Sequence, residues 1–331
     1  NSVDYMPVLY PTTHGASRVP LQVRDPLTPT TASTPPMMPS PYWGEEVIWD
    51  SQSVAHSFAM DRQARVWIAA RIRPAETPAF CQAGSSHPSA QAFPIERSNR
   101  QMQLWDPKTL QMTTVDTCFG THHLNFDDDA KLWFTGSGPV VAWFDTKVLD
   151  ETGDEKLAQG WTVQVLDTNG NGRRDAYVEP GEPIDPAKDT RIERGYYGVA
   201  PSPLDGSIWG STLGMPGGLV RFVPGDDPVN TGLVEFYEVP WNDPEASVQG
   251  FSPRGMDVDS NGVVWTVLSS GHFASFDRSR CDGPLNGPTA TGRHCREGWT
   301  LYPFPGPNYK GATGSGSAES AYYNFIDRFN L

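Results

Sequence analysis

The chain has 331 residues, a formal net charge of −14, and 32 glycines, 31 prolines and 11 tryptophans. Its length exceeds that of most single domains, and its Gly and Pro content indicates short strands joined by turns, so a repeat architecture or a large all-β fold is expected. The acidic charge would repel phosphates and excludes nucleic acid as an expected partner, and no apolar run is long enough to span a bilayer.

Residues 1–42 are rich in proline and threonine and show little hydrophobic periodicity. Because proline fixes φ and removes a hydrogen-bond donor from a β-ladder, we predict an extended N-terminal arm. We recognise no signal peptide, and residue 1 is compatible with a processed end.

A self-similar stretch that ends on tryptophan recurs after residue 42. Its copies read VAHSFAMDRQARVW, GTHHLNFDDDAKLW, YYGVAPSPLDGSIW and SPRGMDVDSNGVVW. Asp61, Asp127 and Asp259 stand at one fixed distance before the tryptophan in three copies, whereas the remaining copy has Pro203 there and Asp205 slightly later. Such self-similarity indicates a repeat fold. We expect the tryptophans in the core and the Asp127 acidic run in a solvated turn.

Each copy begins a series of short strand patterns, and four antiparallel strands joined by turns make one propeller blade. We therefore predict an all-β chain with a β-propeller over residues 43–331. The predicted blades are 43–116, 117–167, 196–240 and 250–306, with insertions at 73–98 and 150–194 and the start of a further blade at 307–331. Most propellers have more blades, so we expect a ring of about seven, completed past residue 331 or by a further chain or domain. The alternative is a small ring that residues 1–42 and 311–331 complete.

The cysteines are Cys81, Cys118, Cys281 and Cys295. Cys281 and Cys295 bracket a Gly/Pro-rich loop and are the preferred disulfide, which leaves Cys81 with Cys118. The alternative is a metal pair formed by Cys295 and His294, for which the sequence offers no second pair. Two disulfides predict an oxidising compartment, so we expect a secreted or periplasmic protein.

The sharpest local motif is DTNGNGRRDAYVE, residues 167–179. It resembles EF-hand-like and dockerin-type calcium loops, with Gly172 at the sharp turn and alternating oxygen-bearing side chains. Val178 occupies the usual closing position, so Glu179 or Glu182 is expected to complete the site. A plain Asn-Gly turn is the alternative. The predicted ligands of a structural Ca²⁺ are Asp167, Asn169, Asn171, the Arg173 carbonyl, Asp175 and Glu179.

A second group of candidate site residues stands at the start of each blade. The first strand of each propeller blade lines the central channel, so we expect these residues to lie close together. The positions there are His56, His122 with His123, Tyr197 and Arg254. Converging imidazoles can ligate a transition metal or act as a general base. Arg254 is expected to stabilise an oxyanion, Tyr197 to donate a proton, and His272 to reach the same site. The alternative is that these groups bind only neighbouring loops or water.

The pattern H/R-x-h-x-h-D-x-x-G-x-h-W resembles the blades of streptogramin B lyase-like and NHL-type β-propellers. Residues 56–67, 122–133 and 254–265 carry it, residues 197–209 carry it more loosely, and the resemblance covers roughly residues 43–306. The resemblance implies the propeller fold, and the family lyases use a divalent metal and a histidine base. Their catalytic motif does not match here residue by residue, and the two long insertions depart from the family pattern.

Two classes of function follow from these patterns. The first is a metal-dependent enzyme acting on a small molecule at the mouth of the tunnel, with lyase-like proton abstraction or redox chemistry on a histidine-bound metal. The second is a non-catalytic binding or scaffold propeller with structural calcium. We favour the enzyme, because His and Arg rather than small apolar residues occupy the converging positions.

Overall fold

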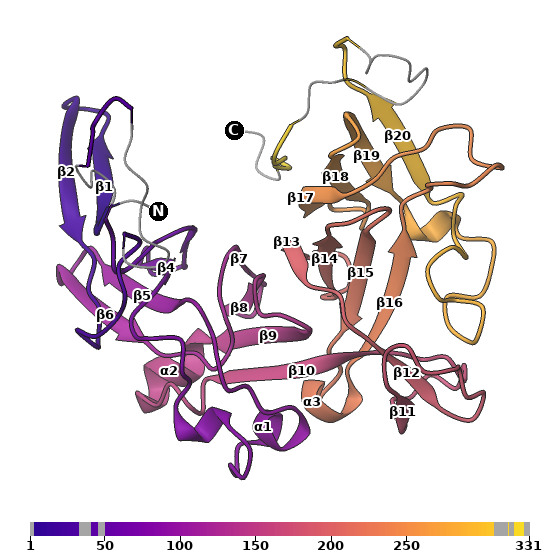
Figure 1. Cartoon of the computed structure of the whole chain (residues 1–331), viewed down its shortest axis with the longest axis horizontal. Helices are drawn as coiled ribbons and strands as arrows, with labels where there is room; N and C mark the ends of the chain where they lie inside the picture. Colours follow the sequence, from indigo (N-terminus) through magenta and orange to yellow (C-terminus); the bar gives the residue numbers. More distant parts are fainter. Residues whose placement is uncertain (1–2, 33–40, 46–49, 308–316, 318–320, 328–331) are drawn as a thin grey trace. The chain divides into compact units, whose positions relative to one another are not determined.

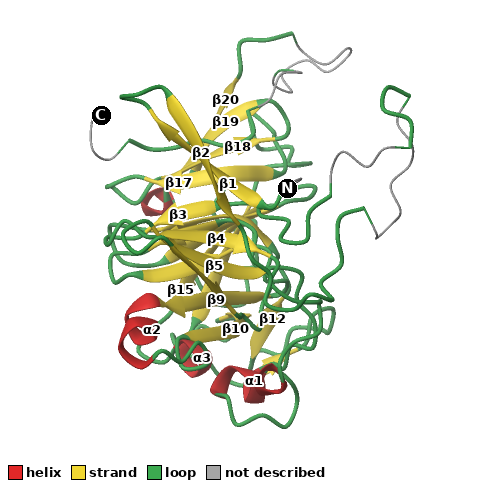
Figure 2. Ribbon diagram, turned by 90° about the vertical axis from the view of Figure 1, so that its left-hand side faces the viewer, coloured by secondary structure: helices red, strands yellow, loops and turns green. Residues whose placement is uncertain are grey.

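The computed structural model describes residues 3–32, 41–45, 50–307, 317 and 321–327. Strands dominate these residues, and the α-helices α1 (Pro88–Ala92), α2 (Thr146–Thr152) and α3 (Pro228–Thr231) are short (Figure 2). None of the helices in this part of the chain has the length or the apolar sequence needed to cross a membrane. The chain forms two compact units, Asn1–Leu124 with Lys147–Gln159, and Asn125–Thr146 with Gly160–Leu331.

The N-terminal segment forms a hairpin, where an extended arm was predicted. Strand β1 (Tyr5–Tyr10) pairs antiparallel with β2 (Gly15–Pro20). Met6 and Val19 bury their side chains in one cluster with Ile68 of the first blade, which gives the hairpin a hydrophobic anchor. Residues 33–40 of the predicted arm lie outside the described part of the chain.

The first blade is a four-stranded antiparallel sheet in sequential order. Its strands are β3 (Phe58–Met60), β4 (Val66–Ala70), β5 (Gln101–Asp106) and β6 (Gln111–Val115). Between β4 and β5 lies the predicted insertion, which contains α1. The central strands β4 and β5 are buried along most of their length, whereas burial alternates along the outer strands β3 and β6.

The second and third blades share one sheet. The second blade consists, in neighbouring order, of β7 (Leu124–Phe126), β8 (Lys131–Phe134), β9 (Val140–Asp145) and β10 (Gln159–Leu166). The third blade consists, again in neighbouring order, of β13 (Tyr196–Pro201), β14 (Ile208–Thr212), β15 (Gly218–Val223) and β16 (Leu233–Glu238). Leu166 of β10 pairs in parallel with Val234 of β16, which joins the two sets. The second insertion adds β11 (Tyr177–Val178) and β12 (Asp189–Ile192), and β12 pairs with β10.

The fourth blade comprises β17 (Pro253–Val258), β18 (Val264–Leu268), β19 (His272–Phe276) and β20 (Trp299–Pro303), again in sequential antiparallel order (Figure 1). Residues 321–327 contain no strand, although Gly255 of β17 donates to the Tyr322 carbonyl. The remaining residues of the predicted further blade, 308–316, 318–320 and 328–331, lie outside the described part. The all-β class and the blade topology are confirmed, whereas a larger ring stays a prediction.

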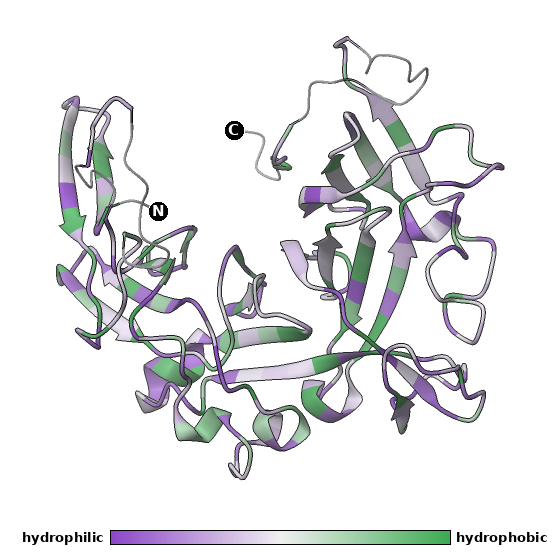
Figure 3. Cartoon of the chain, in the orientation of Figure 1, coloured by the Kyte–Doolittle hydropathy of each residue, from purple (hydrophilic) through white to green (hydrophobic). Residues whose placement is uncertain are grey.

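Hydrophobic side chains lie along the strands of the blades, as the colouring of β15 and β16 illustrates (Figure 3). In the third blade, Val220, Phe222 and Phe236 belong to one buried cluster. Three of the repeat tryptophans, Trp67, Trp133 and Trp209, are 0–2% exposed, in agreement with the predicted core role. Trp265 is only half-buried, and the prediction of a core position for it is wrong. This burial, at about 25 cal/mol per Å² of apolar area, is the main stabilising contribution to each sheet.

In three of the four copies, the repeat motif builds a hydrogen-bonded turn before the tryptophan. The Oδ2 atoms of Asp61, Asp127 and Asp259 accept the indole N–H of the tryptophan six residues later, at 3.0, 2.8 and 3.0 Å. Their Oδ1 atoms accept two backbone N–H groups of the turn, for example those of Asp129 and Lys131 on Asp127. The Asp127 run is therefore a structural turn, as predicted.

Both predicted disulfides are present. Cys81 pairs with Cys118 and Cys281 with Cys295, with Cα–Cα distances of 5.3 and 5.0 Å. His294 instead lies beside the Tyr237 ring, so it forms no metal pair with the bonded Cys295.

Candidate metal centre

Three histidines from two blade openings meet in the first compact unit. One ligand nitrogen each from His56, His122 and His123 lies within 4.8 Å of the other two. The His56 and His122 rings are stacked with centroids 4.0 Å apart, and the His123 ring lies 4.0 Å from His122. Among the described residues, this is the one group of three or more His, Cys, Asp or Glu with such spacing.

Backbone pairing in the first blade explains why these histidines meet. The His56 N–H donates to Ala69 at the end of β4. Thr121, next to His122, donates through its N–H to the Arg100 carbonyl and through its hydroxyl to the Gln101 carbonyl at the start of β5. Because β4 and β5 are paired neighbours, both histidine segments are held at the same end of one sheet.

Backbone strain accompanies the cluster. Val54, two residues before His56, has φ of 42°, which is unfavourable for a β-branched residue. Ser51 and Arg100 hold it there, since Ser51 Oγ accepts the Val54 N–H and the Val54 carbonyl accepts Arg100 Nε, both at 2.9 Å. Strain maintained by surrounding contacts is concentrated at functional sites in proteins.

The imidazoles of His56 and His122 are held in the neutral form at neutral pH. Burial lowers the pKa of His56 to about 4, with Arg100 and His123 adding to the effect. Burial also lowers the pKa of His122 to about 3, and the neighbouring His123, His56 and Arg100 lower it further. Neutral imidazoles keep a nitrogen lone pair available, which is the form that binds metals.

Arg100 is the residue of this site that the sequence patterns did not identify. It is half-buried, and burial followed by the charge of Arg71 lowers its pKa. It remains a cation at any ordinary pH, because arginine titrates above 12. The one feature of the sequence that could have pointed to Arg100 as a site residue was its position directly before β5, at the same end of the sheet as His56.

The predicted partners Tyr197 and Arg254 meet in the second compact unit, together with Tyr322. The Arg254 guanidinium lies 5.6 Å from the Tyr197 ring centroid and 5.1 Å from that of Tyr322, and its Nε donates to Ser269 Oγ. Burial, and then the hydrogen bond and charge of Tyr322, raise the pKa of Tyr197. Such a phenol is a poor proton donor at neutral pH. That these groups share one axis with the histidines stays a prediction.

His272, which was expected to reach the same site, is the first residue of β19, the third strand of its blade. Its side chain is fully buried, its Nδ1 lies 3.0 Å from Ser270 Oγ, and burial lowers its pKa. This environment is that of a core histidine, so we assign it no catalytic role.

The predicted calcium loop has its oxygen-bearing side chains folded inward. Asp167 Oδ1 accepts the Gly170 N–H at 2.7 Å and Oδ2 accepts the Gly172 N–H at 2.8 Å. Asn169 and Asn171 both direct their side-chain amides to Asp175 Oδ2, at 3.0 and 2.6 Å. Asn169 and Asn171 therefore meet Asp175, whereas Asp167 holds the backbone of the turn, and calcium binding by this loop stays a prediction.

Glu179 is not directed to this loop. Its Oε2 lies 2.7 and 2.6 Å from Nε and Nη2 of Arg191, and its side chain is 55% exposed. Glu182 Oε2 accepts the Glu179 backbone N–H at 3.4 Å. The prediction that one of these glutamates closes the site is not supported by their positions, and we do not assign them as ligands.

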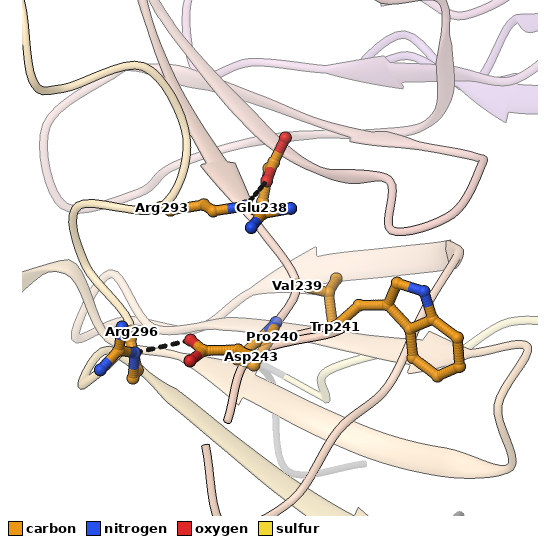
Figure 4. Close-up of a pocket in the computed structure, with 7 residues that line it drawn as sticks. All are labelled: Glu238, Val239, Pro240, Trp241, Asp243, Arg293 and Arg296. Carbon is orange, nitrogen blue, oxygen red and sulfur yellow. Dashed lines mark hydrogen bonds and ion pairs between the residues drawn. The ribbon is translucent and has the colours of Figure 1, made fainter. Parts of the chain in front are cut away.

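A small surface pocket lies in the second unit beside Trp241 (Figure 4). Its charged groups pair with one another, Arg293 with Glu238 at 2.8 Å and Arg296 with Asp243 at 2.7 Å. Because these charges are already matched, and the lining has no histidine or cysteine, we assign the pocket no ligand.

No protein-family model matches the chain, and no curated protein matches it. Solved structures that match include PorZ, a surface component of the type-IX secretion system of Porphyromonas gingivalis, at 10% identity over 75% of this chain and 26% of PorZ, with a TM-score of 0.39. A gluconolactonase from Xanthomonas campestris matches at 14% identity over 73% of this chain and 65% of its own, with a TM-score of 0.35. The calcium-binding protein regucalcin from Agrobacterium tumefaciens matches at 14% identity over 76% and 75%, with a TM-score of 0.27.

Matches at these identities and TM-scores identify neither the activity nor the ligand of this chain. The chain spans about a quarter of PorZ and less than two thirds of the gluconolactonase. The resemblance to streptogramin B lyase-like and NHL-type propellers is not confirmed.

Proposed function

We propose that this chain is a metal-dependent enzyme whose metal is held by His56, His122 and His123. The observation that carries the proposal is the convergence of three imidazole nitrogens within 4.8 Å of one another. Three imidazoles favour zinc, copper, nickel or iron over calcium and magnesium, which prefer oxygen ligands. A set of three protein ligands leaves a coordination position for water or substrate, as in catalytic zinc sites.

The low pKa values of His56 and His122 make lyase-like proton abstraction a poor assignment for these two residues. A general base works best when its pKa lies near the operating pH. A histidine with a pKa of about 4 or 3 is a weak base at neutral pH, although its lone pair remains available to a metal. We therefore assign both histidines as ligands rather than as bases.

Arg100 indicates the charge of the substrate. A cation next to a metal centre opposes binding of the metal unless an anion is present, and no carboxylate belongs to the cluster among the described residues. A small anionic molecule would satisfy both charges, with Arg100 holding a carboxylate or a developing oxyanion. A metal of this class supplies a water activated near neutral pH, or redox chemistry if it is copper or iron.

The disulfides support activity in an oxidising compartment, secreted or periplasmic, because such bonds are rare in reducing cytosol. The second candidate function is a binding or scaffold propeller without catalysis. The convergent Asp167 loop favours it, because that loop stabilises structure and holds no reactive group.

The first test is metal binding by protein made without a polyhistidine tag. Competition with a chromogenic chelator is expected to show one tight Zn²⁺ or Co²⁺ site. His122→Ala and His123→Ala should weaken it by more than the roughly 10–100-fold that outer partners of a metal site contribute. His14→Asn, an exposed histidine outside the cluster, is the matched control. Equal affinity of the control and the two alanine variants would contradict the proposal and favour the scaffold.

The second test separates the metal from the substrate anion. Arg100→Gln removes one positive charge, so Co²⁺ should bind at least as tightly as in the parent protein. Acetate, used as a probe anion, should bind the cobalt form of this variant several-fold more weakly than that of the parent protein. The change in the visible spectrum of the bound cobalt during an acetate titration measures this affinity. Unchanged acetate affinity would contradict the role of Arg100 without affecting the assignment of the ligands.

A further inference from the structure

Asp189, which the calcium motif does not include, is placed against the predicted calcium loop. It is the first residue of β12, and its N–H donates to the Ala176 carbonyl at 3.0 Å. Its Oδ2 accepts the Asp175 N–H at 2.7 Å. The fold thus brings a carboxylate from outside the motif to the end of the loop.

The second carboxylate oxygen of Asp189 makes no regular hydrogen bond. Asp189 is 0% exposed, and among the described residues its Oδ1 has no hydrogen-bond partner, while the Asn169 backbone N–H interacts only weakly with the carboxylate. A buried polar atom without a partner is costly, and native proteins seldom retain one without a ligand, ion or water. Burial raises the pKa of Asp189, and the neighbouring Asp167 and Asp175 carboxylates add to this.

We propose that Asp189 supplies the closing carboxylate of a Ca²⁺ site whose other side-chain ligands are Asp167, Asn169, Asn171 and Asp175. Val178 stands where such loops usually carry this carboxylate, and β12 delivers Asp189 in its place by pairing Tyr177 with Asp189. The Asn169 and Asn171 amides meet at Asp175, so the side chains that would supply further oxygen ligands lie beside this carboxylate. Oxygen ligands on a flexible loop suit Ca²⁺ better than the smaller Mg²⁺.

The site also fixes a second loop of the same unit. Asp167 Oδ2 accepts the Asn286 side-chain amide at 2.8 Å, and the Asp167 carbonyl accepts the Gly287 N–H at 2.7 Å. Asn286 lies inside the loop closed by the Cys281–Cys295 disulfide. Bound Ca²⁺ therefore orders the 150–194 insertion and clamps it to a covalently closed loop.

Calcium titration calorimetry on the full chain tests the assignment, with Glu179→Gln as the matched control for Asp189→Asn. Asp189→Asn is expected to weaken Ca²⁺ binding at least tenfold, whereas Glu179→Gln should change it less than threefold. The reverse ranking, or no binding to the parent protein at millimolar Ca²⁺, would overturn the proposal.

Thermal unfolding provides a readout that does not depend on an accurate affinity. In excess chelator, Asp189→Asn should melt at or above the temperature of the parent protein, because it removes a buried carboxylate that lacks a partner. Adding Ca²⁺ should raise the melting temperature of the parent protein and leave that of the variant unchanged. A variant that melts lower in chelator and is stabilised by Ca²⁺ like the parent would show that Asp189 is only a structural acceptor.

Discussion

The rings of His56 and His122 are stacked with their planes 15° apart and their centroids 4.0 Å apart. Two imidazolium cations at this distance would repel each other, so the arrangement requires at least one neutral ring at neutral pH. The stack is therefore both a candidate ligand set and a source of acid sensitivity.

Acid should destabilise the metal-free protein through these histidines. Their pKa values, about 4 and 3, lie below the ordinary value of 6.5, so the unfolded chain binds protons more readily than the native one. Their contribution to stability is complete above pH about 6.5 and is lost as the pH falls toward 4 and 3. In urea titrations over this range, His122→Gln should reduce proton uptake on unfolding by up to one proton. If the slope of the free energy of unfolding against pH is the same in the variant and the parent protein, His122 titrates normally in the native state.

Between about pH 5.5 and 7.5, His56 and His122 should add nothing to the pH dependence of Zn²⁺ affinity, so the affinity should change by no more than about tenfold per pH unit. Protons compete with a metal only where the ligands titrate, and the pKa values of His56 and His122 lie below this range. Competition titrations at several pH values measure the dependence. A steep loss of affinity below pH 6.5 would indicate ordinary, exposed histidines instead.

Asp127→Asn should destabilise the chain by about 1–3 kcal/mol. The Asp127 carboxylate accepts the Trp133 indole and two backbone N–H groups, and an asparagine amide would set N–H against N–H at one of these bonds. Urea unfolding followed by tryptophan fluorescence measures the change. Asp129→Asn, at an exposed position of the same turn, should stay within about 0.5 kcal/mol of the parent protein. Equal effects of the two substitutions would refute the structural role of Asp127.

Cys281→Ser/Cys295→Ser should lower the free energy of unfolding by roughly 3 kcal/mol, because the loop is no longer closed in the unfolded chain. The same variant should bind Ca²⁺ more weakly, since Asn286 in that loop holds Asp167. Denaturant unfolding with and without Ca²⁺ separates the two effects. A loss of stability without any loss of Ca²⁺ affinity would confine the role of the disulfide to the loop itself.

The blades were predictable because their signals are local. The strands are short segments rich in apolar residues and bounded by turns, and the fixed spacing of Asp61 and Trp67 reflects one hydrogen bond within one turn. The meeting of His56 with His122 was predictable for the same reason, since equivalent positions of repeated units occupy equivalent places. The β1–β2 hairpin was missed because Pro7 interrupts its pattern, and that proline is tolerated because β1 pairs only with β2, as at a sheet edge.

The parts of the two candidate sites that were not predicted depend on contacts between segments distant in sequence. Asp189 reaches the calcium loop through the pairing of β11 with β12, which no spacing within the motif encodes. Arg100 joins the histidines through the register of β4 with β5. Glu179 stands one residue past the usual closing position, and its side chain forms an ion pair with Arg191 instead.

X-ray absorption at the zinc edge tests the central assignment most directly, on untagged protein that carries one equivalent of Zn²⁺. Ligation by His56, His122 and His123 predicts a first shell of nitrogen and oxygen at about 2.0–2.1 Å, with outer-shell scattering from three imidazole rings. That scattering should be lost in the His56→Ala/His122→Ala variant. A first shell of oxygen alone, without imidazole scattering, would contradict the histidine metal centre.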